Sequence, residues 1–192
     1  MAKKTHIAIF LSGSGSNARK IIEHFRGHPS VSVALLVSNK PDLGAAAIAS
    51  ENNIPLLNIS KSMLYDEDLF LKSLASYDID FIVLAGFLLL APPYLVKYFE
   101  KKVVNIHPAL LPKYGGKGMY GHHVHEAVKA ANDTESGITI HFCNAHYDEG
   151  DIIFQARTVI ETSDTPHDIA RKVLALEHQH FAKVIEKCVL KN

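Results

Sequence analysis

Short apolar runs alternate along the chain with segments in which apolar residues recur every three or four positions. Runs of four to eight apolar residues predict buried strands, and the longer spacing predicts helices that pack on a sheet. Because helices that separate such strands imply crossover connections, we expect an α/β fold with a mostly parallel, twisted sheet and helices on both faces. The expected strands are residues 6–11, 31–37, 54–59, 81–85 and 103–107, with helices around residues 21–25, 41–52, 66–77 and 122–131.

The last third of the sequence continues the same domain. Residues 137–142 and 152–160 have the pattern of strands, and a final helix begins at Thr165-Pro166 and runs toward Cys188. No linker, internal repeat or low-complexity segment interrupts residues 1–192. We therefore expect one domain over the whole chain.

The strand at residues 103–107 carries the most informative polar side chains. Pro108 cannot donate to a sheet, so the strand should end at His107. Asn105 and His107 would leave the same face, about 6.6 Å apart along it, at the carboxyl end of a strand where open α/β sheets bind ligands. An amide N–H can hold an oxyanion and an imidazole can move a proton near pH 7, which is equipment for attack at a carbonyl. The alternative is a pair of residues that cap the strand or order the following loop.

Two loops are candidates for ligand contacts. Residues 12–17 (Ser-Gly-Ser-Gly-Ser-Asn) lie between a strand and a helix, where free N–H groups and the helix dipole can bind a phosphate. This loop lacks the lysine of a Walker motif and the third glycine of a dinucleotide fingerprint, and a capped turn without a ligand remains the alternative. The glycine-rich residues 115–121 form a possible lid beside Asn105 and His107.

Two further segments allow two interpretations each. Residues 86–93 are apolar where a loop is ordinarily polar, which indicates either core packing or an apolar wall for a flat ligand. Residues 148–151 contain three carboxylates and form either a solvated acidic turn or part of the site.

Composition excludes several classes of partner and cofactor. Twenty basic and twenty acidic residues leave no net charge, so nothing favours nucleic acid or an anionic membrane, and no apolar stretch approaches the length of a membrane span. Two cysteines without metal or redox spacing favour a cytoplasmic protein with free thiols. His122, His123 and His125 lack a zinc-site pattern, so we expect no metal and interpret them as the exposed start of a helix.

The motif Asn105-x-His107-Pro108-x-Leu110-Leu111-Pro112, with Asp148-x-Gly150 downstream, resembles that of the folate-dependent formyltransferases. The likeness covers nearly the whole chain, and it includes the loop at residues 13–17, the strand end at 84–87 and the pair Glu177-His178. It implies a Rossmann-like formyltransferase fold and direct transfer of a formyl group, without metal. The donor would be 10-formyltetrahydrofolate as co-substrate and the acceptor the amine of glycinamide ribonucleotide, a step of purine biosynthesis.

The resemblance also implies a role for each candidate residue. Asn105, His107 and Asp148 would be catalytic, with Asp148 raising the pKa of His107 and relaying the amine's proton. The ligand contacts would be Gly15, Ser16 and Asn17 for the phosphate, Glu177 for the ribose, and Leu88, Leu89, Leu90, Ala91 and Asn105 for the folate.

The sequence departs from the family pattern in places. The family often has an arginine where this chain has Leu89, and the basic residue that helps to hold the folate has no clear match, Lys61 being nearest. The loop at residues 115–121 is longer than is usual in the family.

Three other functions are weighed against this one. A formyltetrahydrofolate hydrolase would carry a regulatory domain before the first strand, and a methionyl-tRNA formyltransferase would carry a further C-terminal domain and a basic surface. A non-catalytic module that binds a nucleotide phosphate is the alternative from another class. We expect small-molecule substrates and either a monomer or a homodimer.

Overall fold

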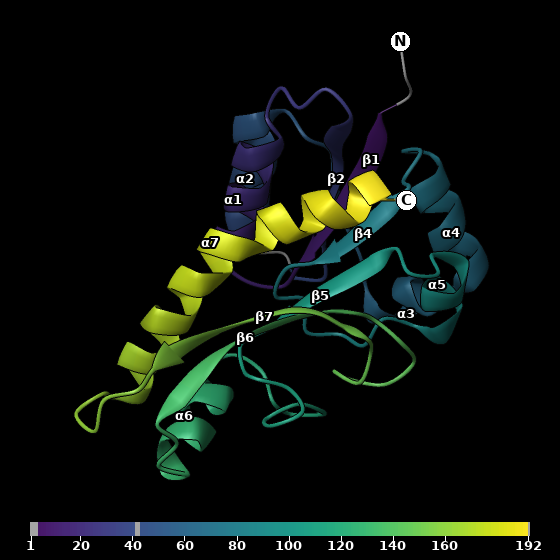
Figure 1. Ribbon diagram of the computed structural model, residues 1–192. Helices are drawn as coiled ribbons and strands as arrows, with labels where there is room; N and C mark the ends of the chain where they lie inside the picture. Colours follow the sequence, from purple (N-terminus) through teal and green to yellow (C-terminus); the bar gives the residue numbers. More distant parts are fainter. Residues whose placement is uncertain (1–3, 41–42, 192) are drawn as a thin grey trace.

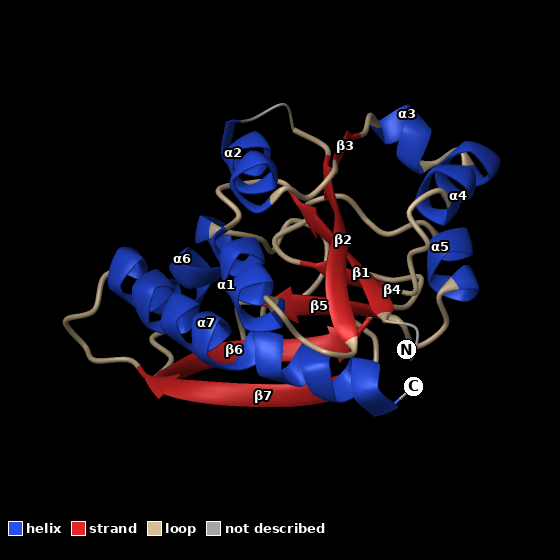
Figure 2. Ribbon diagram, turned by 90° about the horizontal axis from the view of Figure 1, so that it is seen from above, coloured by secondary structure: helices blue, strands red, loops and turns tan. Residues whose placement is uncertain are grey.

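The computed structural model describes residues 4–40 and 43–191, and a seven-stranded sheet runs through them (Figures 1 and 2). The strand order is β3-β2-β1-β4-β5-β6-β7. The first five strands in this order pair in parallel. Strand β6 pairs antiparallel with β5, and β7 pairs antiparallel with β6. The strands are β1 (Thr5–Leu11), β2 (Val31–Ser38), β3 (Leu56–Asn58), β4 (Phe81–Leu84), β5 (Val103–His107), β6 (Glu135–Phe142) and β7 (Ile152–Val159).

Helices cover both faces of the sheet (Figure 2). One face packs against α1 (Ser16–Phe25), α2 (Leu43–Asn52), α6 (His122–Ala130) and α7 (Pro166–Lys191). The other packs against α3 (Lys61–Leu64), α4 (Glu67–Ala75) and α5 (Pro93–Tyr98). Strand β1 shows why its sequence is apolar throughout, since Ile7 and Ile9 enter the first core and Ala8 and Phe10 enter the second.

The expected α/β fold is confirmed, with differences in detail. The predicted helix at residues 66–77 is α4, and the Asp66 side chain caps it by accepting from the amide of Leu69 at 3.0 Å. Helices α3 and α5 were not predicted, because four and six residues are too few to show a helical period. The predicted start of the helix at residues 41–52, at Pro41-Asp42, lies outside the described residues, and the described part of that helix is α2. The single-domain expectation remains a prediction.

Strand β5 joins the parallel and antiparallel halves of the sheet. It ends at His107 directly before Pro108, as predicted. On its far side it pairs with β6, so that Asn105 lies opposite His141 and His107 lies opposite Thr139. The chain therefore brings side chains from a later, antiparallel strand to the end of β5.

Candidate active site

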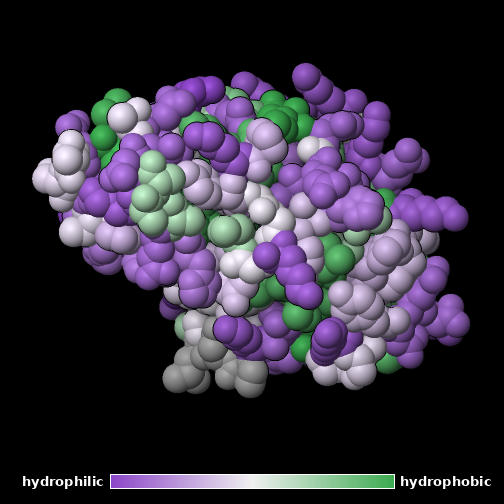
Figure 3. All heavy atoms as spheres, turned by 90° about the horizontal axis from the view of Figure 1, so that it is seen from below, coloured by the Kyte–Doolittle hydropathy of each residue, from purple (hydrophilic) through white to green (hydrophobic). Residues whose placement is uncertain are grey.

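A cleft of about 840 Å³ opens at the carboxyl ends of the parallel strands. Seen from below, the molecule shows hydrophobic residues in several places among hydrophilic ones, including near the middle of the view (Figure 3). The lining comes from the loop before α1, the segment after β4, the end of β5, the glycine-rich loop, the acidic turn after β6, and α7. One cleft thus reaches nearly all the segments that the sequence singled out.

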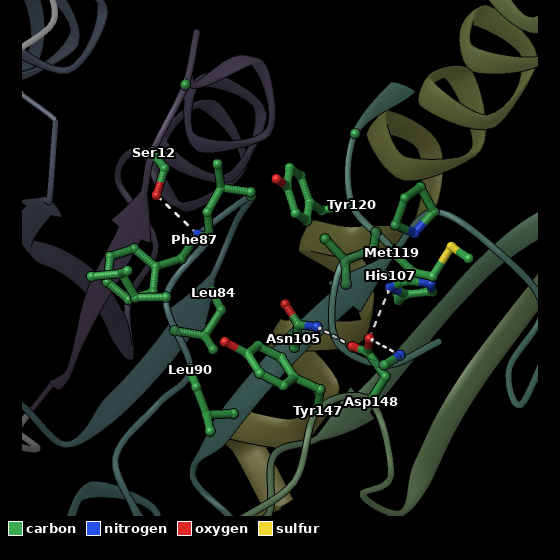
Figure 4. A pocket seen from close by; sticks show the side chains of 18 of the residues that line it. Ser12, Leu84, Phe87, Leu90, Asn105, His107, Met119, Tyr120, Tyr147 and Asp148 are labelled. Atoms are coloured by element: carbon green, nitrogen blue, oxygen red, sulfur yellow. Dashed lines mark hydrogen bonds and ion pairs between the residues drawn. The ribbon is translucent and has the colours of Figure 1, made fainter. Parts of the chain in front are cut away.

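Asp148 lies at the centre of the predicted catalytic group (Figure 4). Its Oδ2 is 3.4 Å from Nδ1 of His107 and accepts a 3.0 Å hydrogen bond from the amide of Gly116. Its Oδ1 accepts from Nδ2 of Asn105 at 3.4 Å and lies 3.5 Å from Nε2 of His141. The structure therefore brings Asn105, His107 and Asp148 together from β5 and from a turn 41 residues beyond His107.

His107 is held by two groups that favour its charged form. Its Nε2 is 2.7 Å from the carbonyl oxygen of Tyr114, and since a carbonyl can only accept, this nitrogen carries a proton. Burial nevertheless lowers the pKa of His107 below its usual value, and the opposing effects of the Asp148 charge and the Tyr114 carbonyl are smaller. Asp148 therefore acts on His107 in the expected direction, but burial of a residue that is only 3% exposed has the larger effect on its pKa.

Asp148 stays ionised at neutral pH. Burial alone would raise the pKa of its carboxyl group, but the contacts with His141, His107 and the Gly116 amide together outweigh burial and hold that pKa below its usual value. The site thus places a fixed negative charge beside an imidazole that is mainly neutral.

The other end of the cleft contains a buried amide and carboxylate pair. Nδ2 of Asn17 donates to Oε2 of Glu177 at 2.6 Å, and Oδ1 of Asn17 is buried without a hydrogen-bond partner among the described residues. Burial raises the pKa of Glu177, and the Asn17 hydrogen bond opposes that shift. Lys40 lines the cleft and brings a positive charge.

Gly15 is the N-cap residue of α1 and has a left-handed φ of 71°. A Cβ there would overlap the side chain of Ile48, so the position requires glycine. Of the three predicted phosphate-binding residues only Asn17 lines the cleft, and Gly15 and Ser16 contribute backbone N–H groups at the start of the helix.

The apolar segment after β4 lies between the cleft and the second core. Leu88, Leu89, Leu90 and Ala91 all line the cleft, and Ala91 is also buried in the second core. Hydrogen bonds hold the backbone of this wall in place, because the amide of Leu88 donates to Ser12 Oγ at 2.9 Å and the hydroxyl of Tyr65 donates to the Leu90 carbonyl at 3.2 Å.

Residues 5–185 match the family described as formyl transferase. The chain belongs to the formyl transferase family. The resemblance noted in the sequence and the formyltransferase fold are thereby confirmed.

Curated relatives within the family share much of the chain. It is 43% identical over 189 residues to the chloroplastic phosphoribosylglycinamide formyltransferase of Arabidopsis thaliana, covering 95% of this chain and 65% of that protein. It is 34% identical over 188 residues to the phosphoribosylglycinamide formyltransferase of Haemophilus influenzae, covering 94% and 85%. The chain thus spans somewhat less than two thirds of the length of the plant relative.

Solved structures in the family superpose closely. The phosphoribosylglycinamide formyltransferase of Bacillus halodurans is 33% identical, with a TM-score of 0.85 over 95% of this chain and 94% of that one. The enzyme of that name from Anaplasma phagocytophilum is 28% identical, with a TM-score of 0.88 over 98% and 88%.

Sequence reasoning missed His141. Its Nδ1 donates to the carbonyl of Phe142 at 2.9 Å, so in the neutral ring Nε2 can accept from Nδ2 of Asn105 at 3.1 Å. Both hydrogens of the Asn105 amide are then engaged, one by His141 and one by Asp148. The predicted donation from Asn105 to an oxyanion requires one of these two bonds to be exchanged.

The three histidines of α6, His122, His123 and His125, differ from one another in the structure. His125 is 6% exposed and lines the cleft, so its predicted exposure is wrong, and burial lowers its pKa to about 4.

Within the described residues no cluster of histidine, cysteine, aspartate or glutamate is arranged to hold a metal ion. None of the described helices has the length and apolar character needed to cross a membrane.

Gly150 explains the spacing of Asp148-x-Gly150. A Cβ at Gly150 would overlap the carbonyl of Phe142, so the acidic turn can fold back onto the end of β6 only with glycine there. We expect Gly150→Ala to lower the free energy of unfolding by about 1–3 kcal/mol, measured by urea denaturation.

Gly13→Ala is the matched control, because no atom lies within 4 Å of its Cβ position and its φ is not left-handed. That variant should unfold at the wild-type urea concentration. Equal stability of both variants would contradict the tight contact between Gly150 and β6.

Proposed function

We propose that the protein transfers a formyl group from 10-formyltetrahydrofolate to the amine of glycinamide ribonucleotide. The carrying observation is the single cleft in which Asn105, His107 and Asp148 lie between a helix N-terminus and an apolar wall. The names of the relatives from Arabidopsis and Haemophilus support the same reaction. The products are formylglycinamide ribonucleotide and tetrahydrofolate.

The chemistry requires one new bond, one broken bond and one proton moved. The substrate amine attacks the formyl carbon, and the resulting tetrahedral oxyanion lies beside Asn105 and the protonated form of His107. The imidazolium then gives its proton to the folate nitrogen as that carbon–nitrogen bond breaks. The proton lost by the amine, relayed through water and Asp148, restores the imidazolium, so no metal and no covalent enzyme intermediate is needed.

Nδ1 is the nitrogen of His107 suited to this transfer. Nε2 is bound at 2.7 Å to the Tyr114 carbonyl, whereas Nδ1 faces Asp148 at the longer distance of 3.4 Å. A proton on Nδ1 is therefore held less tightly than a proton on Nε2. It also lies next to the Asp148 carboxylate, which would supply a new proton to Nδ1 after the transfer.

Both substrates fit the ends of the cleft. The phosphate would meet the N–H groups of Gly15 and Ser16 and the side chain of Asn17, with the charge of Lys40 nearby. The buried Glu177 would accept hydrogen bonds from the ribose hydroxyls. Leu88, Leu89, Leu90 and Ala91 would pack on the flat pterin and leave their backbone groups to bind its edge.

The cysteines bear on the compartment in which the protein acts. The thiol of Cys143 is free, which suits the reducing cytoplasm. We infer a cytoplasmic enzyme that acts on small molecules as a monomer or a homodimer.

A direct assay separates this proposal from its alternatives. Protein is mixed with glycinamide ribonucleotide and a formyl-folate analogue, and the absorbance of the released folate is followed. Release that depends on the ribonucleotide supports transfer. Release without it would indicate a hydrolase, and binding without release would indicate a nucleotide-binding module.

Asn17→Ala tests the phosphate end. We expect KM for the ribonucleotide to rise roughly 10- to 100-fold with kcat little changed, because a hydrogen bond to a charged group contributes about 1.5–3 kcal/mol. The measurement is initial rate against ribonucleotide concentration at saturating folate analogue.

Lys20→Ala is the control on the same helix. Lys20 is exposed and pairs with Glu23 at 2.9 Å, outside the cleft. An unchanged KM in Asn17→Ala would count against the phosphate site.

A further inference from the structure

The segment directly after the Leu110-Leu111-Pro112 motif contacts two members of the catalytic group through its backbone. The carbonyl of Tyr114 accepts from Nε2 of His107 at 2.7 Å, and two residues later the amide of Gly116 donates to Oδ2 of Asp148 at 3.0 Å. One short stretch of main chain thus fixes the imidazole and the carboxylate relative to each other.

This stretch has an unfavourable conformation that needs support. Tyr114 has a φ of 57°, a left-handed value that costs energy for a residue with a large side chain. Gly115 passes so close to Asp148 that a Cβ on it would lie 3.3 Å from the Asp148 Cβ. The two catalytic contacts therefore depend on backbone angles that Tyr114 does not adopt by preference.

The Tyr114 side chain supplies an anchor on the side away from the cleft. Its hydroxyl donates to Oδ2 of Asp133 at 2.9 Å, and its ring packs against the core that contains α7. Asp133 follows α6 and precedes β6, so it is held between two regular elements. The Tyr114 hydrogen bond is also the main reason that the pKa of Asp133 lies below its usual value, which keeps the acceptor charged.

We propose that Tyr114 is a positioning residue for the catalytic pair, and that its hydroxyl, bound to Asp133, holds the backbone of residues 114–116 in the conformation that fixes His107 and Asp148. The proposal rests on the proposed function, because it assigns the contact a role in formyl transfer. Neither Tyr114 nor Asp133 lines the cleft, so neither touches a substrate.

Tyr114→Phe removes the hydroxyl and keeps the ring. We expect kcat to fall roughly 10-fold while KM for the ribonucleotide stays within about twofold of wild type, since a small displacement of a catalytic group reduces turnover more than binding. Asp133→Ala should give the same result. The double variant should be no worse than either single variant, because both remove one shared interaction.

Lys113→Ala is the matched control. Lys113 also contacts Asp133, at 3.2 Å, but its side chain is 68% exposed, and its removal leaves the Tyr114–Asp133 hydrogen bond in place. Its kcat and KM should equal those of wild type.

A spectroscopic measurement tests the position of His107 without any turnover. In ¹⁵N-histidine NMR the wild type should show His107 with its proton on Nε2, and Tyr114→Phe should lose this single tautomer because the carbonyl acceptor moves. The assignment comes from the spectrum of a His107→Gln variant. If the wild type transferred no formyl group, the proposed function would fail, and the tautomer signal would still test the positioning.

Two results would overturn the proposal. One is wild-type kcat and an unchanged His107 signal in both Tyr114→Phe and Asp133→Ala. The other is a loss of activity that appears only as a higher KM with an unchanged signal, which would place the effect in substrate binding.

Discussion

His107→Ala should lower kcat by at least about 100-fold with little change in the KM values of either substrate. Removal of a general acid typically costs two to four orders of magnitude, because the departing folate nitrogen must then leave without a proton from the enzyme. Initial rates at saturating substrates measure the effect, and a thermal unfolding curve shows that the variant is folded.

A histidine outside the cleft supplies the control. His123 is 63% exposed on α6 and does not line the cleft, so His123→Ala should keep wild-type rates. Near-normal turnover in His107→Ala would show that His107 is not the general acid. The rate would then come from holding the two substrates close together.

Asp148→Asn should reduce kcat by about 100-fold at pH 7, and the deficit should shrink as the pH falls. The charge of Asp148 raises the pKa of His107 against the larger lowering effect of burial. Without that charge the pKa of His107 falls further, so less imidazolium is present at pH 7 and acidification restores it. The side chain also loses its ability to relay the amine's proton.

The pH profile of kcat is the deciding measurement. In the wild type, activity that needs imidazolium should decline as the pH rises through the pKa of His107, and in Asp148→Asn the decline should begin at lower pH. Asparagine can still accept from the Gly116 amide, so the turn should remain in place. A profile that moved to higher pH would contradict the electrostatic role of Asp148.

The parallel half of the fold could be predicted from the sequence because its strands are buried. The buried parts of β1 and β4, residues 7–11 and 81–84, face a core on both sides, so each is a continuous apolar run that stands out from the helices along the chain. The end of β5 could also be predicted, because Pro108 cannot continue the hydrogen bonding of a strand.

His141 could not be predicted in the same way. Its strand was expected from residues 137–142, but its position depends on the register in which β6 pairs with β5, which places it opposite Asn105. A shift of one residue would turn that side chain to the other face, and nothing local in the sequence sets the pairing. The contact of the Tyr114 carbonyl with His107 was equally hidden, because it depends on main-chain geometry rather than on side-chain identity.

Because the pairing changes from parallel to antiparallel at β5, the two ends of the cleft are built by different parts of the fold. The proposed ribonucleotide end is built by α1 and α7, whereas His141 and Asp148 come from β6 and the turn after it. If the proposed function is correct, the acceptor amine can be exchanged by redesigning the helices at the first end, while the strand pairing that assembles the proposed catalytic group is left intact. A scaffold divided in this way is suited to new acceptors for the same one-carbon donor.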